Sequence, residues 1–215
     1  MSYPRVILIG GAPMSGKTTV ARMLAAKLGY GCISTDDLGE AIRAVTTKES
    51  HPHLHPMNGY DYREYYVTRS VEALIADISL EHRAMWPAVQ GVIRKHTTWG
   101  EPTVMEGWSL WPEEVAELRL PNVASLWFVA HEETLRERLV KAVEFYRGAS
   151  DEEAMIEHYL ARSFWYNARL KEAVKKFALT SIEPPPQAPV QKIVELCLEQ
   201  LKSEGSGPER LLKNQ

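Results

Sequence analysis

Residues 10–19, GGAPMSGKTT, combine glycines, a lysine and hydroxyl groups in a spacing that is typical of phosphate binding. The fixed positions of the pattern are filled by Gly11, Gly16, Lys17 and Thr18. Glycines let backbone N–H groups approach a chain of phosphates, and a following helix N-terminus adds favourable electrostatic potential. In such loops the lysine reaches the terminal phosphates and the hydroxyl binds Mg²⁺. The motif therefore predicts a nucleotide site.

The elements around this segment fit the same interpretation. Residues 5–9 read as a short β-branched strand, and residues 18–28 read as an amphipathic helix that Gly29 closes. A strand, a glycine-rich loop and a helix N-terminus together form a phosphate cradle. The predicted nucleotide contacts come from Gly11, Ala12, Pro13, Met14, Ser15, Gly16, Lys17, Thr18 and Thr19.

Two adjacent carboxylates follow the expected second strand, residues 31–34. Asp37 and Glu40 have the spacing of a capping box, so we expect Asp37 to open the next helix. Asp36 is then left to face the terminal phosphate, where it would accept a proton from an attacking hydroxyl or bind Mg²⁺ with Thr18. The alternative role for Asp36 is a second helix cap.

Another carboxylate ends the expected third strand, residues 103–106. Glu106 would hold a magnesium-bound water or an acceptor hydroxyl, and its alternative is an ordinary charge at a strand end. Trp108 follows closely and is a candidate for contact with the acceptor, although tryptophan more often packs than binds a ligand.

A long segment, residues 38–100, separates the second and third strands and is where we expect the phosphoryl acceptor to bind. Arginine suits phosphate and carboxylate because its planar fork bonds bidentately. Pro87 is expected to kink this segment or to start a new helix. The candidates for binding an anionic acceptor are Arg43, Arg63, Arg69, His53 and Tyr62, and the alternative is a solvated loop and helix face.

Histidines at positions 51, 53 and 55 invite a metal interpretation, but their alternating spacing lacks the established zinc patterns. The densest cationic set on the chain lies further on, within a predicted lid at about residues 132–165. Positive charge there would neutralise a phosphoryl group during transfer. The lid residues chosen as catalytic candidates are Arg138, Arg147 and Arg162.

Five short β-rich runs alternate with helical patterns, which predicts an α/β fold with a parallel sheet covered on both faces. Ligands gather at the carboxyl ends of strands in such sheets. The expected strands are residues 6–9, 31–34, 103–106, 124–130 and 177–182. We expect a single domain at residues 1–202, with a final helix at residues 190–202 and a mobile tail at residues 203–215.

Composition limits the classes of partner. The formal net charge is −3, and 25 Lys and Arg residues are scattered along the 215-residue chain, so nucleic acid is not expected as a partner. Two distant cysteines favour reduced thiols, and the apolar N-terminal run is too short for a membrane span or a signal peptide. We expect a cytoplasmic protein, monomeric or dimeric.

Together, the phosphate loop, Ser-Thr-Asp at residues 34–36, Glu106-Gly107 and the basic lid resemble the small P-loop metabolite and nucleoside kinases. Residues 33–36, followed by Ile42-Arg43 and by Glu106-Gly107, look most like 2-phosphoglycerate kinase-like proteins. The resemblance implies a three-layer αβα fold with strand order 2-3-1-4-5, and ATP- and Mg²⁺-dependent transfer to a small phosphorylated or carboxylated acceptor.

The chain departs from this family at Met14, where a small residue is usual, at the bulky Trp108, and in having no extra N-terminal domain. These departures concern the acceptor and not Lys17, Thr18 or Asp36. One alternative is a nucleoside or nucleotide kinase that holds a base by aromatic stacking. The other is a regulatory protein that binds ATP without transferring phosphate.

Overall fold

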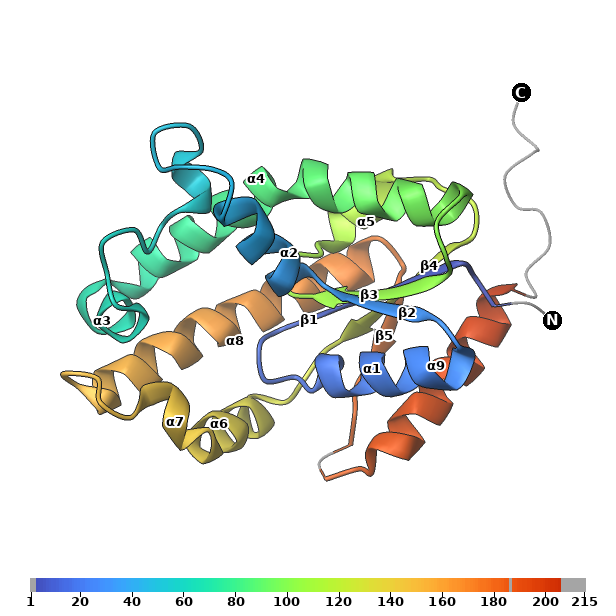
Figure 1. Cartoon of the computed structure of the whole chain (residues 1–215). Coiled ribbons are helices and arrows are strands. Elements are labelled where there is room, and N and C mark those ends of the chain that lie inside the picture. Colours follow the sequence, from blue (N-terminus) through green and yellow to red (C-terminus); the bar gives the residue numbers. More distant parts are fainter. Residues whose placement is uncertain (1–2, 186, 206–215) are drawn as a thin grey trace.

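A five-stranded parallel sheet forms the centre of the protein (Figure 1). A computed structural model describes residues 3–185 and 187–205, and the side chains up to residue 202. The strand order is β2-β3-β1-β4-β5, as the family resemblance implies. The strands are β1 (Val6–Gly11), β2 (Gly31–Ser34), β3 (Thr103–Gly107), β4 (Val123–Phe128) and β5 (Thr180–Ile182).

Helices cover both faces of the sheet, which gives the expected α/β arrangement. Helices α1 and α9 pack on one face, and α4, α5 and α8 pack on the other. The helices are α1 (Lys17–Leu28), α2 (Thr35–Arg43), the 3₁₀ helix η1 (Pro52–Leu54), α3 (Tyr62–Thr68), α4 (Val71–Thr98), α5 (Pro112–Glu117), α6 (Glu132–Lys141), α7 (Val143–Tyr146), α8 (Glu152–Lys176) and α9 (Val190–Gly205). None of the described helices is long and apolar enough to cross a bilayer.

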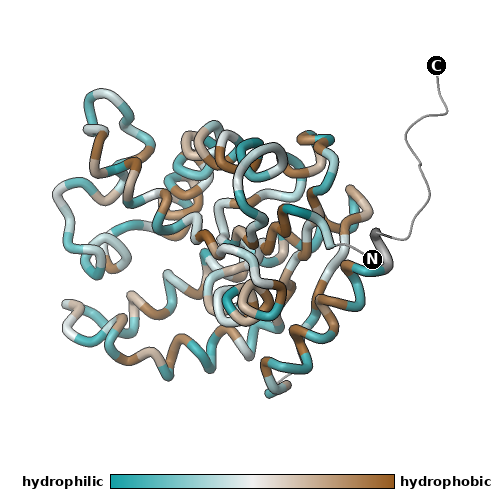
Figure 2. The backbone as a smooth tube through the Cα atoms, turned by 45° about the vertical axis from the view of Figure 1, so that its right-hand side comes forward, coloured by the Kyte–Doolittle hydropathy of each residue, from teal (hydrophilic) through white to brown (hydrophobic). Residues whose placement is uncertain are grey.

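Strand β1 shows why the sheet is buried on both sides. All six of its residues are buried, and successive side chains point to opposite faces. Ile7 and Ile9 pack with α1 and α9, whereas Val6 and Leu8 pack against the α4 and α8 side. Figure 2 shows the hydrophobic segments gathered in the interior and the hydrophilic ones outside.

A third apolar cluster lies beyond the carboxyl edge of the sheet. It joins α3, α4, α6 and α8 through Tyr65, Leu74, Leu139, Tyr159 and neighbouring side chains. The polypeptide between β2 and β3 therefore packs against the segment that follows β4. Because parallel strands end at the same edge, this cluster lies beside the phosphate loop and supports it.

Local competition for caps decides where α2 begins. The predicted capping box at Asp37 and Glu40 is wrong, because Ser34 caps α2 through a 3.1 Å hydrogen bond from the Asp36 N–H. The Ser34 hydroxyl, three residues before Asp37, accepts the hydrogen bond of the helix N-terminus instead. Both carboxylates consequently lie in the first turn of α2, at the mouth of the sheet.

Other boundaries also differ from expectation. Residues 177–179 were predicted as strand, but they close α8, with Ala178 in the left-handed region at φ 51° and Leu179 N–H bonded to Val174 O. Helix α4 continues through Pro87, which starts no new helix. Helix α9 extends to Gly205, and the rest of the predicted tail, residues 206–215, lies outside the described residues.

The end of β3 packs directly against the start of α2. A Cβ atom on Gly107 would overlap the Thr35 side chain, which is itself fully buried. Only glycine permits this approach, and the neighbouring residues, Glu106 and Asp36, are brought together by it.

We expect Gly107→Ala to lower the free energy of unfolding by about 1–3 kcal/mol, because the added methyl group must displace Thr35. The matched control is Gly91→Ala on α4, where a Cβ meets nothing within 4 Å and the change should raise stability by up to about 1 kcal/mol. Urea denaturation of both variants tests this, and equal stability of the two would contradict it.

Candidate nucleotide and acceptor sites

The phosphate loop connects β1 to α1 at the carboxyl edge of the sheet. Gly16 is the N-cap of α1, adopts a left-handed conformation at φ 90°, and makes no side-chain capping hydrogen bond. The Ser15 hydroxyl is buried and has no hydrogen-bond partner. The loop therefore presents unsatisfied donors at a helix N-terminus, as an anion site requires.

Lys17, Thr18 and Glu106 form a polar cluster under this loop. The Thr18 hydroxyl donates to the Glu106 carboxylate at 3.0 Å, and Lys17 Nζ lies 3.5 Å from Ala12 O. Burial lowers the pKa of Lys17, while the charges of Glu106 and Asp36 oppose that shift. Burial likewise raises the pKa of Glu106, against the effect of Lys17. Each charge in the cluster thus depends on the others.

The donor set fits magnesium. A threonine hydroxyl and carboxylate oxygens are the hard ligands that Mg²⁺ prefers, and Mg²⁺ keeps several waters or phosphate oxygens as further ligands. In residues 3–185 and 187–205, no group of three or more His, Cys, Asp or Glu side chains is arranged to hold a metal without such additional ligands. Thr18, Glu106 and Asp36 are the residues that would hold Mg²⁺.

Arg138 lies over the phosphate loop, as expected for a charge-neutralising residue. Its Nη1 donates to Met14 O at 2.9 Å, and a Cβ on Gly16 would come within 2.8 Å of the same nitrogen. Met14 adopts a left-handed φ of 62°, and its side chain packs against both the sheet core and the α3/α8 cluster. Its unusual bulk is therefore explained by packing.

A cavity of about 460 Å³ extends from the phosphate loop toward α9. Its far wall contains Ala188, Val190 and Ile193, which the sequence analysis did not identify. These side chains are apolar and lie on the side of the loop away from β3, so they offer a surface for a nucleotide base. These apolar residues follow a proline-rich segment and match no nucleotide-binding motif, so their place beside the loop becomes visible only in the structure.

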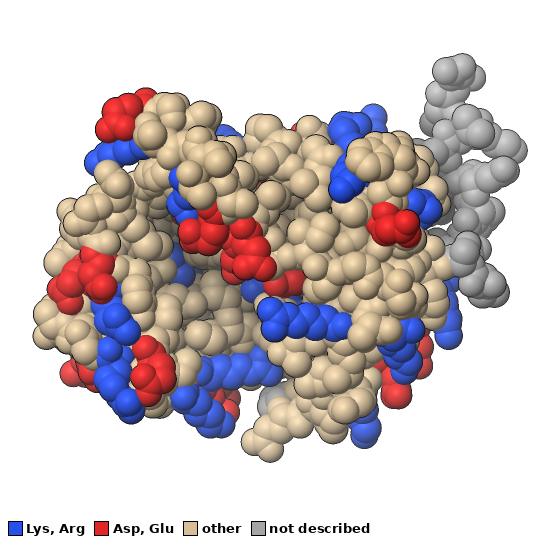
Figure 3. Space-filling view, in the orientation of Figure 1, with Lys and Arg blue, Asp and Glu red and all other residues tan. Residues whose placement is uncertain are grey.

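A second cavity, of about 270 Å³, lies between α2, α4 and α8. Asp36 and Asp37 line its outer part, and Trp108 and Arg162 line it together with residues of α4. The charge of Asp36 also acts on Lys17 and Glu106, so this carboxylate lines the second cavity within electrostatic range of the polar cluster under the loop. Figure 3 shows the hollow on this face, with acidic side chains along its upper rim and basic ones below and beside it.

Arg43 lines this second cavity, but its guanidinium is already paired. Its two terminal nitrogens lie 2.6 Å from Glu81 and 2.6 Å from Glu40. Burial raises the pKa of Glu81, and Arg43 opposes that shift. Arg43 therefore favours the ionised form of Glu81, and both of its terminal nitrogens are already engaged by carboxylates.

The predicted convergence of Arg43, Arg63 and Arg69 on one pocket is wrong. Arg69 forms a 2.6 Å ion pair with Asp77, and Arg63 stacks on the Tyr62 ring, so neither lines the cavity with Arg43. His53 is exposed in η1, away from the cavity lining. Arg43 ends α2, whereas Arg63 lies in the first turn of α3 and Arg69 follows its end, so each guanidinium meets different partners.

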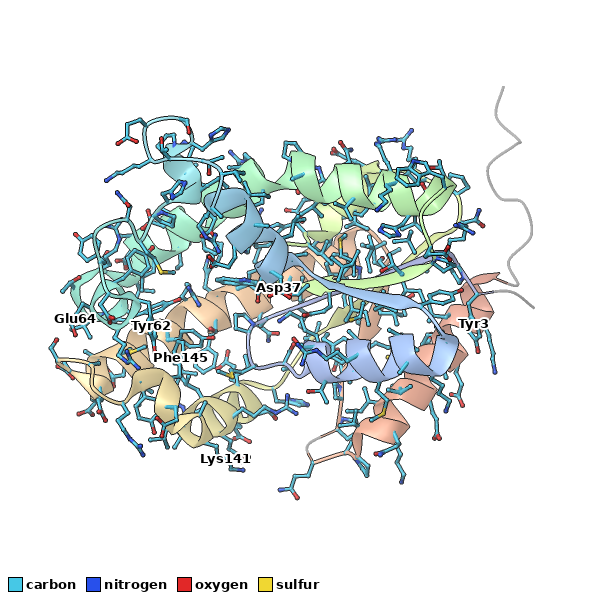
Figure 4. All side chains as sticks on the ribbon, viewed as in Figure 1. Tyr3, Asp37, Tyr62, Glu64, Lys141 and Phe145 are labelled. Carbon is cyan, nitrogen blue, oxygen red and sulfur yellow. The ribbon has the colours of Figure 1, made fainter. Side chains whose placement is uncertain are left out.

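Tyr62 joins the insertion to the predicted lid. Its hydroxyl donates to Phe145 O at 2.9 Å, and the two rings lie 5.7 Å apart, side by side in Figure 4. Nearby, the Glu64 carboxylate accepts hydrogen bonds from the N–H and hydroxyl of Ser150. Tyr62 thus connects α3 to α7 and does not line the second cavity.

Arg162 and Arg147 differ completely in environment. Arg162 is 3% exposed, donates to the Tyr66 hydroxyl at 2.7 Å, and lies 4.5 Å from the Trp108 ring. Arg147 forms an exposed ion pair with Glu144 at the end of α7 and lines neither cavity. Arg147 therefore does not join Arg138 or Arg162 in this structure, because its guanidinium pairs with Glu144.

Four buried polar atoms without hydrogen-bond partners line the second cavity. They are Thr35 Oγ1, His82 Nε2, Ser109 Oγ and Arg162 Nε. Buried polar groups are normally satisfied, and each unmet one costs about 1–3 kcal/mol. Within the described residues, these four side chains therefore leave the cavity wall with polar atoms that a bound water or ligand would satisfy.

The sequence analysis missed Glu81 and His82, although a signal for them exists. Both are buried on the face of α4 that also carries Ile78, Met85 and Val89. Two ionisable residues on the apolar face of a helix are unusual and point to a site. His82 Nδ1 accepts a 3.0 Å hydrogen bond from Trp111 Nε1.

The buried imidazole of His82 makes the free energy of unfolding decrease in acid. Burial, then the charges of Arg162 and Lys17, lower the pKa of His82 from 6.5 to about 3. Because the folded state favours the neutral ring, stability is complete above pH 6.5 and is lost as pH falls toward 3. The contribution of this one group changes by up to about 1.4 kcal/mol per pH unit.

We expect His82→Gln to lose this acid sensitivity, so the difference in unfolding free energy between wild type and variant should shrink as pH falls. The control is His53→Gln, an exposed histidine whose loss should leave the pH profile as in wild type. Chemical denaturation at a series of pH values measures both. Parallel profiles for wild type and His82→Gln would contradict the prediction.

Comparison with known proteins places the chain in a family. A family model described as an AAA domain matches residues 6–162, which include the phosphate loop, Asp36, Glu106 and Arg138. The chain belongs to the AAA domain family. The match covers both cavities' walls up to Arg162, but not α9.

Curated relatives of this AAA domain protein include archaeal 2-phosphoglycerate kinases. This chain is 31% identical over 113 residues to the 2-phosphoglycerate kinase of Pyrococcus furiosus, and the match covers 52% of this chain and 37% of that protein. It is 32% identical over 122 residues to the one from Methanocaldococcus jannaschii, covering 55% and 38%. The matched part spans little more than a third of each archaeal protein.

Solved structures show the same fold over nearly the whole AAA domain protein. A shikimate kinase from Acinetobacter baumannii, in complex with shikimate, has a TM-score of 0.58 at 14% identity, covering 96% of this chain and 97% of that one. A gluconokinase from Sinorhizobium meliloti has a TM-score of 0.55 at 20% identity, covering 95% of each chain. The fold is that of the P-loop kinases.

Proposed function

We propose that the protein transfers the terminal phosphoryl group of ATP, with Mg²⁺, to a hydroxyl of a small anionic metabolite. The observation that carries this proposal is the position of Asp36. Its carboxylate lies between the Lys17/Glu106 cluster and the second cavity. A phosphoryl donor on one side and an acceptor on the other would meet at this group.

In this mechanism the protein supplies positioning and charge. Asp36 accepts the proton of the acceptor hydroxyl as it attacks. Lys17 and Arg138 stabilise the negative charge that develops on the transferring group. Mg²⁺ held by Thr18 and the neighbouring carboxylates would supply positive charge that offsets the charge of the phosphates. Glu106 and Thr18 orient the metal side of the site.

The second cavity supports an acceptor with one compact anionic group. Of the two arginines among its lining residues, Arg43 is paired with carboxylates, whereas Arg162 is in none of the ion pairs of the described residues. A single available guanidinium suits a carboxylate or a phosphate group. The named activity of the archaeal relatives makes 2-phosphoglycerate the first acceptor to test.

The nucleoside kinase alternative has less support from the geometry. The Trp108 ring is already contacted by the Arg162 guanidinium at 4.5 Å and by the His82 ring at 4.7 Å. Aromatic surface occupied in this way is not free to stack on a base. The alternative of an ATP-binding regulator without transfer does not explain why Asp36 borders a cavity with unsatisfied polar groups.

We assign the parts of the proposed site to successive segments of the chain. Within a domain at residues 1–202, the insertion at about residues 38–100 supplies one wall of the acceptor site. The segment at about residues 132–165 acts as a lid and brings Arg138 to the phosphate loop. Contacts of Tyr62 and Glu64 with the lid link acceptor binding to closure.

We expect Asp36→Asn to lower acceptor-dependent ADP release by at least about 100-fold, because general-base contributions are typically of that size. The matched carboxylate-to-amide control is Glu101→Gln, an exposed residue just before β3 at the opposite end of the strands. A panel of hydroxy acids and their phosphates serves as acceptors. No acceptor-dependent turnover in wild type, or full turnover in Asp36→Asn, would overturn the proposal.

Lys17→Ala should abolish transfer while leaving the fold intact, because this buried amine serves a ligand and not the core. Removing Lys17 relieves its own desolvation but leaves Glu106 buried without its cation, so the melting temperature should fall while the protein stays folded at the assay temperature. ADP release and thermal unfolding measure the two effects separately. A Lys17→Ala protein with full turnover would disprove the role of the loop.

A further inference from the structure

The protonation state of His82 is determined by its neighbour Trp111. The indole N–H can only donate, and it lies 3.0 Å from His82 Nδ1, so Nδ1 must accept. A neutral imidazole with an accepting Nδ1 carries its proton on Nε2. Trp111 therefore selects the tautomer in which Nε2 is a hydrogen-bond donor.

The surroundings keep this ring neutral. His82 is 1% exposed, and the cations nearest to it are Arg162 from α8 and Lys17 from α1, both of which disfavour a positive imidazole. Glu81, its neighbour on α4, is engaged by Arg43. The Trp108 ring meets the imidazole edge to face at 4.7 Å. His82 thus offers a donor that carries no charge.

His82 is one of the residues that line the second cavity, and its buried Nε2 donor is unpaired within the part of the chain that the structure describes. Arg162 Nε is in the same condition in the same cavity, and both side chains contact Trp108. Two unsatisfied N–H groups on residues that share one cavity and one aromatic neighbour offer the paired donors that the oxygens of an anionic group accept from.

We propose that His82 Nε2–H and Arg162 together bind the anionic group of the phosphoryl acceptor, with Trp111 as the positioning residue that holds the His82 tautomer. The proposal rests on the kinase function proposed above and names what distinguishes its acceptor: a hydroxy compound with one compact anionic group, carboxylate or phosphate. A neutral donor adds a directed hydrogen bond without adding a second cation. The site therefore selects for geometry as well as charge.

Two substitutions separate the two nitrogens of His82. In His82→Asn the amide oxygen can still accept from Trp111, but the side chain is too short to donate into the cavity. In His82→Gln the amide nitrogen reaches the Nε2 position and can donate. We expect Asn to raise the acceptor Kd by about ten-fold or more, Gln to restore most of the affinity, and neither to change the Kd of ATP.

Three probes distinguish the possible anionic groups: glycerate carries a carboxylate, glycerol 2-phosphate carries a phosphate, and 2-phosphoglycerate carries both. Binding is measured by calorimetry with ADP and Mg²⁺ present, so that no turnover occurs. A His82→Asn penalty on glycerate and 2-phosphoglycerate identifies a carboxylate, and a penalty on glycerol 2-phosphate and 2-phosphoglycerate identifies a phosphate. Equal Kd values for wild type and His82→Asn with all three probes overturn the proposal.

Nitrogen NMR of the imidazole provides a readout that is independent of activity. Wild-type His82 should show a protonated Nε2 and an unprotonated Nδ1, and Trp111→Phe, which keeps a ring but removes the donor, should yield a mixture of tautomers. At least one anion should displace the Nε2–H signal. A protonated Nδ1, or no displacement by any probe, contradicts the proposal. Absence of phosphoryl transfer with these NMR results intact would instead reject the kinase function.

Discussion

The close approach of Gly107 to Thr35 is the constraint on which both cavities depend. It places the end of β3 against the first turn of α2, with no room for a side chain between them. Glu106 precedes the glycine and Asp36 follows the threonine, so the same contact brings their carboxylates to the phosphate loop. Parallel register then aligns Glu106 with Ile9 of β1, one step from the loop. The missing side chain at Gly107 thus sets where Glu106 and Asp36 lie relative to the phosphate loop.

The charges in the two cavities are arranged differently. Beneath the loop, Lys17 and Glu106 are buried together, and each offsets the desolvation of the other. In the second cavity, Arg162 lies among aromatic rings and forms no ion pair with any carboxylate in residues 3–185 and 187–202. A buried cation without a counter-ion is costly for folding and favourable for binding an anion. The protein thus gives up stability where a ligand restores it.

The sequence predicted those parts of the structure that depend on local pattern. The phosphate loop, four of the five strands and the strand order follow from β-branched runs, glycine spacing and the family resemblance. Residues 177–179 were misassigned because the left-handed residue that ends α8 is Ala178, and helix ends of this kind are recognised in a sequence by a glycine. Asp37 was misassigned because Ser34 and Asp37 compete for one helix N-terminus, and sequence alone does not rank them.

Side-chain partners were the least predictable part of the site. Arg63 and Arg69 have the right chemistry for an anionic acceptor, but stacking on Tyr62 and pairing with Asp77 decide where they point. His82 differs from these arginines, because the sequence shows it as a polar residue on the apolar face of α4. Its hydrogen-bond partner Trp111 lies 29 residues away and cannot be inferred from the sequence. Long-range pairs of this kind require the fold.

Met14 lies in the phosphate loop and contacts elements on both sides of it. Its side chain packs into both the sheet core and the cluster around α3 and α8, and its carbonyl receives Arg138 from α6. The same cluster contains Tyr66, whose hydroxyl accepts from Arg162 in the acceptor cavity. A shift of α6 and α8 relative to the sheet would therefore move Arg138 and Arg162 together. A small residue at position 14 would keep the carbonyl that receives Arg138 but would lose the packing of the Met14 side chain against both clusters.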